Sequence, residues 1–339
     1  IGMLIVFWYG GQLVIDGNMS KGEFVAFWAA LARLTWPVIA LGFVVSIVQR
    51  GRAGYARIVD ILEAKPDVVD GPLVAPESPL GSLEVKNLAY SFGPQQVLTD
   101  VSLRVPAGKS LAIVGRVGSG KSTLATLLAR ILPTPKGAVF IDGNDVCDLP
   151  LRFVRKTIGY AQQDCFLFST TVARNVGFSL ENPDSDSSLE LVRAAAKEAQ
   201  ILDEILELPD GMDSVVGERG LQLSGGQRQR VALARALAYE PKILILDDPL
   251  SAVDARTEKA ILAAIGRQTQ CRTVILITSR IAAAAKCDRV VVLDAGRVVQ
   301  EGTHDELLRC EGLYGKFAEQ QRLQREIEAI DNGAEKGAS

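Results

Sequence analysis

The first fifty residues concentrate the apolar residues of the chain, and their pattern predicts helices that cross a membrane. Residues 24–48 (FVAFWAALARLTWPVIALGFVVSIV) form a run of 25 residues with a single charge, at Arg33. At about 1.5 Å per residue, a helix of this length crosses the hydrocarbon core of a bilayer with some tilt. The alternative is a buried core helix, which is disfavoured because soluble helices of this length normally show a polar face. The pattern therefore predicts a transmembrane helix at about 24–48.

Residues 1–15 are also apolar, and the turn IDGNMSKG (15–22) separates them from the long span. These features predict two antiparallel helices joined at the outer face of the membrane. A signal peptide is not expected, because residues 1–15 lack an initiating Met, a basic n-region and the length of a full span. We interpret residues 1–62 as the C-terminal part of a larger transmembrane domain. The basic segment RGRAGYAR (50–57) follows the span and predicts that this side is cytoplasmic.

A different composition begins after residue 62. Residues 63–82 (EAKPDVVDGPLVAPESPLGS) are rich in Pro and contain acidic residues, which predicts an extended linker. Beyond this linker, short β-rich runs alternate with helical stretches, and this alternation is typical of an α/β domain. We expect the domain at 83–325, with a helical subdomain at about 180–240 and a flexible polar tail at 326–339.

Residues 115–122 (GRVGSGKS) match the Gly-x-x-x-x-Gly-Lys-Ser pattern of a phosphate-binding loop. They lie between a β-rich run and an amphipathic helical stretch, the context that such a loop requires. Backbone N–H groups and the helix N-terminus hold the phosphates in this motif, Lys121 reaches the β- and γ-phosphates, and Ser122 offers a hydroxyl to Mg²⁺. The predicted fold is an α/β P-loop NTPase preceded by a membrane-spanning helix. The predicted nucleotide-binding residues of the loop are Gly115, Arg116, Val117, Gly118, Ser119, Gly120, Lys121, Ser122 and Thr123.

Residues 243–248 (ILILDD) have the pattern of a buried strand that ends in two adjacent carboxylates. A P-loop NTPase needs a second strand ending in an acid that holds Mg²⁺, and we assign this role to Asp247. Asp248 then lies where a carboxylate can polarise the attacking water. The alternative is a solvated strand end without a chemical role.

Residues 223–227 (LSGGQ) place Ser and paired Gly before a helical stretch. We interpret them as a second anion-binding helix N-terminus that has no structural reason to exist alone, and because it lacks a lysine we expect it to act on a nucleotide bound by another subunit. With these motifs the chain, from residue 1 to about 324, resembles the ABC ATPases and, given its transmembrane span, the ABC exporters of the multidrug type. The resemblance implies a head-to-tail dimer that binds two ATP molecules, each between one phosphate loop and the other subunit's LSGGQ. The residues of this signature segment are Leu223, Ser224, Gly225, Gly226 and Gln227.

Further roles are implied by the resemblance. Phe92 stands at the aromatic position that stacks on adenine, and Gln163 stands at the position of a glutamine that contacts Mg²⁺ and communicates with the membrane domain. Residues 216–220 (VGERG) resemble the loop that contacts the partner's coupling helices, and the segment with Ser251 and Asp254 (SAVD) resembles the loop exchanged across the dimer. The implied Mg²⁺ ligands are Ser122, Gln163 and Asp247.

Three positions depart from the family pattern. Phe92 replaces a frequent Tyr and keeps the aromatic face. Asp248 replaces the catalytic Glu, and the loss of one methylene withdraws the carboxylate by more than about 1 Å from the water that it orients. Ser279 replaces the histidine that contacts the γ-phosphate, and the single histidine, His304, lies in the downstream GTHDELL segment and cannot replace it. The implied catalytic set of Asp248, Gln163 and Ser279 is therefore weakened, and beside an intact LSGGQ it predicts a heterodimer in which this chain carries a degenerate ATP site. A fully active homodimer is the alternative.

The charge balance and the cysteines exclude other classes. The chain has 37 Lys and Arg against 40 Asp and Glu, so its net charge of -3 does not favour nucleic acid as a partner. Five scattered cysteines indicate neither a zinc cluster nor a disulfide framework. We expect an integral membrane protein with a cytoplasmic ATP-binding domain, whose partners are the lipid bilayer, a second half-transporter and a small hydrophobic or amphipathic export substrate. Two alternatives are an ATP-gated regulatory protein that moves no substrate and a soluble ABC ATPase, which the apolar span disfavours.

Overall fold

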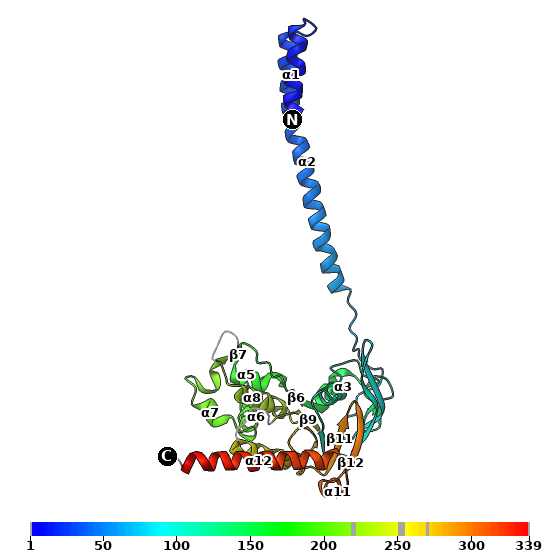
Figure 1. Ribbon diagram of the computed structural model, residues 1–339, viewed down its shortest axis with the longest axis vertical. Helices are drawn as coiled ribbons and strands as arrows, with labels where there is room; N and C mark the ends of the chain where they lie inside the picture. The colour runs from blue at the N-terminus through cyan, green and yellow to red at the C-terminus, as the bar shows by residue number, and fades with distance from the viewer. Residues whose placement is uncertain (1, 218–221, 250–254, 269–270, 338–339) are drawn as a thin grey trace. The chain divides into compact units, whose positions relative to one another are not determined.

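A computed structural model of the chain describes residues 2–217, 222–249, 255–268 and 271–337 (Figure 1). The chain divides into two compact units, Ile1–Pro66 and Asp67–Ser339, and each is described by itself.

The first unit is a helical hairpin made of α1 (Gly2–Ile15) and α2 (Lys21–Leu62). The ring of Phe7 in α1 lies 5.9 Å from the ring of Phe24 and 5.7 Å from that of Trp28, so the two helices pack through aromatic side chains. A capping box between Ser20 and Glu23 starts α2 by satisfying the first N–H groups of the helix. The helices predicted on either side of the 15–22 turn are therefore present.

Helix α2 is long and apolar enough to cross a membrane. It contains the predicted span of 24–48, and none of its described side chains is buried inside the protein. The helix continues without a break through the basic segment 50–57 to Leu62. Its 42 residues amount to about 63 Å at 1.5 Å per residue, twice the thickness of a bilayer core, so a large part of α2 extends beyond the hydrocarbon region.

The second unit contains a six-stranded sheet with the order β12-β11-β3-β10-β9-β6. Neighbouring strands in this sheet are parallel except for β12, which pairs with β11 in the antiparallel direction. All five residues in each of β3, β9 and β10 are buried, because both faces of the sheet are covered, and this explains their continuous apolar sequences. The strands are β3 (Ser110–Val114), β6 (Ile158–Ala161), β9 (Ile243–Asp247), β10 (Thr273–Ile277), β11 (Arg289–Asp294) and β12 (Arg297–Gly302).

A second sheet, with the order β2-β1-β4-β5, packs its apolar residues into a core shared with the six-stranded sheet. Its edge strand β2 pairs with β1 in the antiparallel direction, from Leu83↔Val105 at one end to Phe92↔Gln95 at the other. The strands are β1 (Leu83–Phe92), β2 (Gln95–Val105), β4 (Val139–Ile141) and β5 (Asn144–Asp145), and a separate short pair is β7 (Thr170–Thr171) with β8 (Val215–Val216).

Helices cover the six-stranded sheet and form a separate group beside it (Figure 1). That group, α5 to α8, packs with α9 and one face of the six-stranded sheet in a single apolar core, and it overlaps the residues predicted as a helical subdomain, about 180–240. Helix α12 continues to Gly337, through the segment for which a flexible tail is predicted. The helices of this unit are α3 (Lys121–Leu128), α4 (Leu151–Thr157), α5 (Val172–Val176), α6 (Asp186–Glu198), α7 (Leu202–Leu206), α8 (Gly225–Ala238), α9 (Ala255–Gln268), α10 (Ile281–Ala284), α11 (His304–Arg309) and α12 (Leu313–Gly337), with 3-10 turns at Gly177–Ser179 and Gly211–Asp213.

Part of the segment predicted as a linker, from Val69 onwards, is hydrogen-bonded to other elements of the second unit. The Arg130 guanidinium, just after α3, donates to the Val69 carbonyl at 2.8 Å. The backbone N–H of Leu151 at the start of α4 donates to Asp70 at 2.7 Å. Further along, Asp142 accepts hydrogen bonds from three successive backbone N–H groups at residues 80–82. The linker is therefore anchored at two places, through partners that are far away in the sequence.

Candidate functional site

A cavity of about 340 Å³ lies beyond the carboxyl ends of β3, β9 and β10. This is where α/β sheets commonly bind ligands, because the loops after parallel strands meet at one edge. The cavity, called the phosphate cavity below, brings together residues from four separate motifs. Its lining consists of Gln95, Val97, Gly115, Val117, Gly118, Gly120, Lys121, Ser122, Thr123, Gln163, Asp247, Asp248, Ile277, Thr278 and Ser279.

The loop between β3 and α3 is shaped by its glycines. Gly118 and Gly120 have φ angles of +81° and +98°, which residues with a side chain rarely adopt. A Cβ atom on Gly120 would also lie 2.7 Å from Leu98 Cδ2. No side chain caps α3, which starts at the next residue, so the first N–H groups of the helix are available to an anion in the cavity.

Lys121 is folded back onto the phosphate loop (residues 115–123). Its Nζ donates to the carbonyls of Gly115 at 2.9 Å and Arg116 at 2.7 Å. Burial lowers the pKa of this ammonium group, and the neighbouring Asp247 and Asp248 carboxylates act in the opposite direction. The loop thus holds a partly desolvated cation at the cavity, where a phosphate can replace the carbonyl contacts.

Asp247 ends β9 and is 2% exposed. Burial raises the pKa of its carboxyl group, whereas hydrogen bonds from Ser122 and Tyr160 lower it. The Tyr160 hydroxyl donates to Asp247 Oδ2 at 3.3 Å, a support that the sequence motifs did not indicate.

The oxygen atoms around Asp247 suit Mg²⁺. Within the described part of the chain, no three His, Cys, Asp or Glu side chains form a metal cluster. Mg²⁺ is usually held by one or two carboxylates together with substrate phosphates and water, so a complete protein cage is not needed. Ser122, Gln163 and Asp247 would hold the ion in this manner.

Asp248 is fixed through its backbone rather than through its carboxylate. It has a φ angle of +47°, its N–H donates to the Ile277 carbonyl at 2.9 Å, and its own carbonyl accepts from Gln229 Nε2 at 2.8 Å. Its Oδ1 atom is buried and has no hydrogen-bond partner among the described residues. Burial raises the pKa of the Asp248 carboxyl group, and Arg280 opposes this shift. A buried acceptor without a partner is costly, so this atom is suited to a water or ligand in the cavity.

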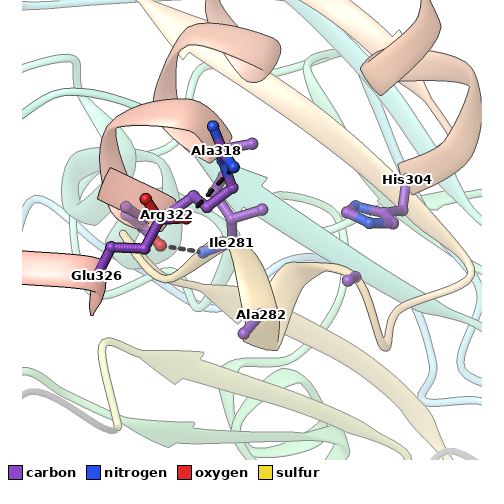
Figure 2. A pocket seen from close by; sticks show the side chains of 8 residues that line it. Ile281, Ala282, His304, Ala318, Arg322 and Glu326 are labelled. Atoms are coloured by element: carbon purple, nitrogen blue, oxygen red, sulfur yellow. Dashed lines mark hydrogen bonds and ion pairs between the residues drawn. The ribbon is translucent and has the colours of Figure 1, made fainter. Parts of the chain in front are cut away.

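Ser279 lines the same cavity from the turn after β10, two residues beyond the last strand residue, Ile277. The preceding residue, Thr278, is tied to β3 through its N–H, which donates to the Ile113 carbonyl at 3.1 Å. The histidine of the chain is elsewhere: His304 begins α11, and its Nδ1 lies 2.8 Å from the Tyr314 hydroxyl. His304 belongs to a different cavity, of about 430 Å³, shown in Figure 2.

Some predicted nucleotide-binding residues do not line the phosphate cavity. Phe92 ends β1, is 49% exposed and makes an edge-to-face contact with Tyr90. Arg116 contributes its carbonyl to Lys121, and Ser119 is buried beneath the loop. The described lining adds Gln95 and Val97 of β2, which no motif indicated.

The signature segment has a local structural role, so the interpretation that it has none is wrong. Ser224 is the N-cap of α8 and forms a capping box, because its hydroxyl accepts from the Gln227 N–H at 3.2 Å and Gln227 Oε1 accepts from the Ser224 N–H at 2.9 Å. Gln227 Nε2 also donates to Glu204 at 3.0 Å. The Ser-x-x-Gln spacing is itself a capping-box pattern that the sequence analysis missed.

No signature residue lines the phosphate cavity of the same chain. Gly225 instead borders another cavity, of about 420 Å³, together with Gln163 and Phe166. Action on a partner's nucleotide stays a prediction. The dimer-loop residues Ser251 and Asp254, and most of the segment 216–220, lie outside the described residues.

We expect Lys121→Ala to weaken nucleotide binding by about tenfold or more, because it removes the cation that faces the phosphates. The measurement is labelling of this chain by a photoreactive ATP analogue in the intact protein. Lys109→Ala is a matched control, since Lys109 pairs with Asp288 away from the cavity. The prediction is contradicted if labelling of the Lys121→Ala variant depends on the analogue concentration in the same way as labelling of the parent.

Comparisons with known proteins find relatives of the family that the site residues indicate. A family model described as ABC transporter matches residues 98–251. An ABC transporter ATP-binding protein of Bacillus subtilis, YknU, is 39% identical and covers 97% of this chain and 56% of the relative. A multidrug efflux ATP-binding/permease protein of Mycobacterium tuberculosis is 43% identical over 91% of this chain and 26% of the relative. An ATP-dependent lipid A-core flippase of Desulfotalea psychrophila is 38% identical over 91% of this chain and 54% of the relative.

A solved structure supports the same assignment. The structure of a bacterial Atm1-family ABC exporter with ATP bound matches with a TM-score of 0.75 and 35% identity, over 94% of this chain and 57% of that chain. The chain thus spans about half the length of several of these proteins. Together with helix α2, these relatives place it in a membrane with its nucleotide-binding domain in the cytoplasm. The chain carries the ATP-binding domain of the ABC transporter family.

Proposed function

We propose that the chain is the ATP-binding and membrane-spanning subunit of an ABC exporter, which couples ATP binding and hydrolysis to export of a small hydrophobic or amphipathic substrate. The observation that carries the proposal is the convergence of the phosphate loop, Gln163, Asp247 and Asp248 on one cavity, in a chain that also has a helix able to span a bilayer. The substrate class rests on the relatives, because one is named a multidrug efflux protein and another a lipid A-core flippase.

The side chains of the cavity would share the work at the γ-phosphate. Lys121 neutralises phosphate charge, and the Asp248 carboxylate orients a water molecule and accepts its proton. Bound Mg²⁺ would neutralise charge between the β- and γ-phosphates. Ser279 supplies a short neutral hydroxyl where the family has an imidazole. The shorter carboxylate of Asp248 and the weaker donor at Ser279 together favour slow ATP hydrolysis at this site.

We further propose that the slow site belongs to a heterodimer. The chain keeps every signature residue, with Ser224 and Gln227 held in a defined geometry at the start of α8. A segment preserved in this way is useful to a nucleotide bound by another subunit, whereas the chain's own site serves mainly for binding. A fully active homodimer and an ATP-gated regulatory subunit are the competing assignments.

Reconstitution of the full-length protein and its partner in lipid vesicles tests the proposal. We expect ATP hydrolysis to rise when a transported hydrophobic drug or lipid is added, and the compound to move across the vesicle membrane only with ATP. Vesicles that contain the Lys121→Ala variant should show a reduced response. Nucleotide binding without stimulated hydrolysis or transport, over a panel of such compounds, would favour the regulatory subunit instead.

The composition of the purified complex separates the two dimers. If the complex contains only copies of this chain and hydrolyses ATP as fast as a fully active homodimeric exporter, two proposals are contradicted: that the protein is a heterodimer and that its own site hydrolyses ATP slowly.

A further inference from the structure

The turn between β10 and α10 carries Ser279 into the phosphate cavity, and it is fixed from several sides. The Arg280 N–H donates to Thr278 Oγ1 at 3.0 Å, and the Arg280 side chain forms an ion pair with Glu258 of α9. These contacts hold the residues on either side of Ser279. They leave the Ser279 carbonyl and the Ile281 N–H to be satisfied by another part of the molecule.

Gln321 of the C-terminal helix α12 satisfies both groups. Its Oε1 accepts from the Ile281 N–H at 2.9 Å, and its Nε2 donates to the Ser279 carbonyl at 2.5 Å. Arg280, the N-cap residue of α10, makes no side-chain cap, so Gln321 caps this short helix from α12. Figure 2 shows Ile281 facing the α12 side chains, with a dashed line marking the bond to its N–H, while His304 lies apart from them.

We infer that Gln321 is a positioning residue for the γ-phosphate end of the cavity. Ser279 lines the cavity together with Lys121 and Asp248, the residues that face the β- and γ-phosphates in a P-loop site. Gln321 does not line it, and acts only through the backbone on both sides of the Arg280 turn residue. Its amide is suited to the task because it donates and accepts at once. The inference rests on the proposed function, since it requires ATP in this cavity.

The geometry predicts a selective effect on nucleotides. A misplaced Ser279 alters contacts at the γ-phosphate, whereas the phosphate loop continues to hold the β-phosphate. Gln321→Leu, which removes both hydrogen bonds at similar size, should therefore lower the affinity for MgATP by about three- to tenfold, the range expected for the loss of one or two hydrogen bonds. The affinity for MgADP should stay within about twofold of the parent.

The experiment is competition by MgATP and MgADP against a photoreactive ATP analogue that is crosslinked to this chain in the intact transporter and separated from other subunits by electrophoresis. Gln321→Glu is a second variant, because its carboxylate still accepts from the Ile281 N–H but cannot donate to the Ser279 carbonyl. It should lose MgATP affinity and keep MgADP affinity, as Gln321→Leu does. The neighbouring Gln320 is exposed, and Gln320→Leu should leave both affinities unchanged.

Three outcomes are informative. Affinities for MgATP and MgADP that both stay at the parent values in the two Gln321 variants would overturn the inference. An equal loss of both nucleotides would overturn it too, because α12 would then only support the fold. If the parent chain is not labelled at all, the proposed ATP-binding function fails, and with it the basis of the inference.

Discussion

ATP hydrolysis at this chain's own site should rise by about 100-fold when Asp248→Glu and Ser279→His are combined, and it should exceed the sum of the two single increases. Glu extends the carboxylate by one methylene towards the attacking water, and a misplacement of about 1 Å can cost about 100-fold in rate. His supplies a longer donor to the γ-phosphate. Both side chains line one cavity, so the two changes act on the same transition state and are expected to be non-additive.

The environment of Asp248 favours a gain in hydrolysis when Glu is placed at this position. Asp248 has a raised pKa because it is buried, and a carboxylate with a raised pKa is a stronger base. Its Oδ1 has no partner among the described residues, so a longer side chain at this position does not have to break a hydrogen bond of that atom.

The measurement is steady-state ATPase activity of the assembled transporter in which the partner's own catalytic Glu is replaced by Gln, with an intact signature in the partner. Asp247→Glu makes the same chemical change one residue earlier, at the predicted Mg²⁺ ligand, and should not raise the rate. A double variant that stays as slow as the parent would show that Asp248 and Ser279 are not what limits the site.

Ser224→Arg should abolish most of the ATPase activity of the assembled transporter, by about 100-fold, whereas Asp248→Asn should change it little. Arg places a bulky side chain at the start of α8 and removes the capping hydroxyl of Ser224. If the signature segment acts on the partner's nucleotide, this change damages the faster of the two sites. Asp248→Asn affects only the slow site.

The loss of a helix cap is itself destabilising, by about 1 kcal/mol, and needs a control. Ser185 caps α6 in the same group of helices, α5 to α8, through its hydroxyl, which accepts from the Ser188 N–H. Ser185→Arg therefore removes an equivalent cap without touching the signature segment, and it should leave turnover close to the parent rate. The assignment of the two sites would be reversed if Asp248→Asn stops hydrolysis and Ser224→Arg does not.

The parts of the site that the sequence predicts are those encoded by contiguous residues. The phosphate loop depends on glycines and a lysine within one strand-loop-helix segment, and β9 on five successive buried residues before Asp248. Their meeting in one cavity follows from parallel strands, whose carboxyl ends lie at the same edge of the sheet.

The supporting contacts could not be predicted, because they join residues that are distant in sequence. Tyr160 to Asp247, Gln229 to Asp248 and Gln321 to Ser279 are pairings of this kind. The anchoring of the 63–82 segment could not be predicted for the same reason. Its Pro-rich composition does not indicate that it hydrogen-bonds to Arg130, Leu151 and Asp142. The capping box of α8 is different, because Ser-x-x-Gln was readable in the sequence and only the interpretation was wrong.

Because the linker is hydrogen-bonded from Val69 onwards, only a short free segment connects α2 to the second unit. Only residues 63–68 separate the end of α2 at Leu62 from Val69, and at full extension this stretch reaches about 24 Å. Val69 is held by Arg130, just past the end of α3, the helix that begins at Lys121. Once residues 63–68 are fully extended, any further pull on α2 acts through Val69 on Arg130. Arg130 follows the end of α3, and Lys121 is the first residue of that helix.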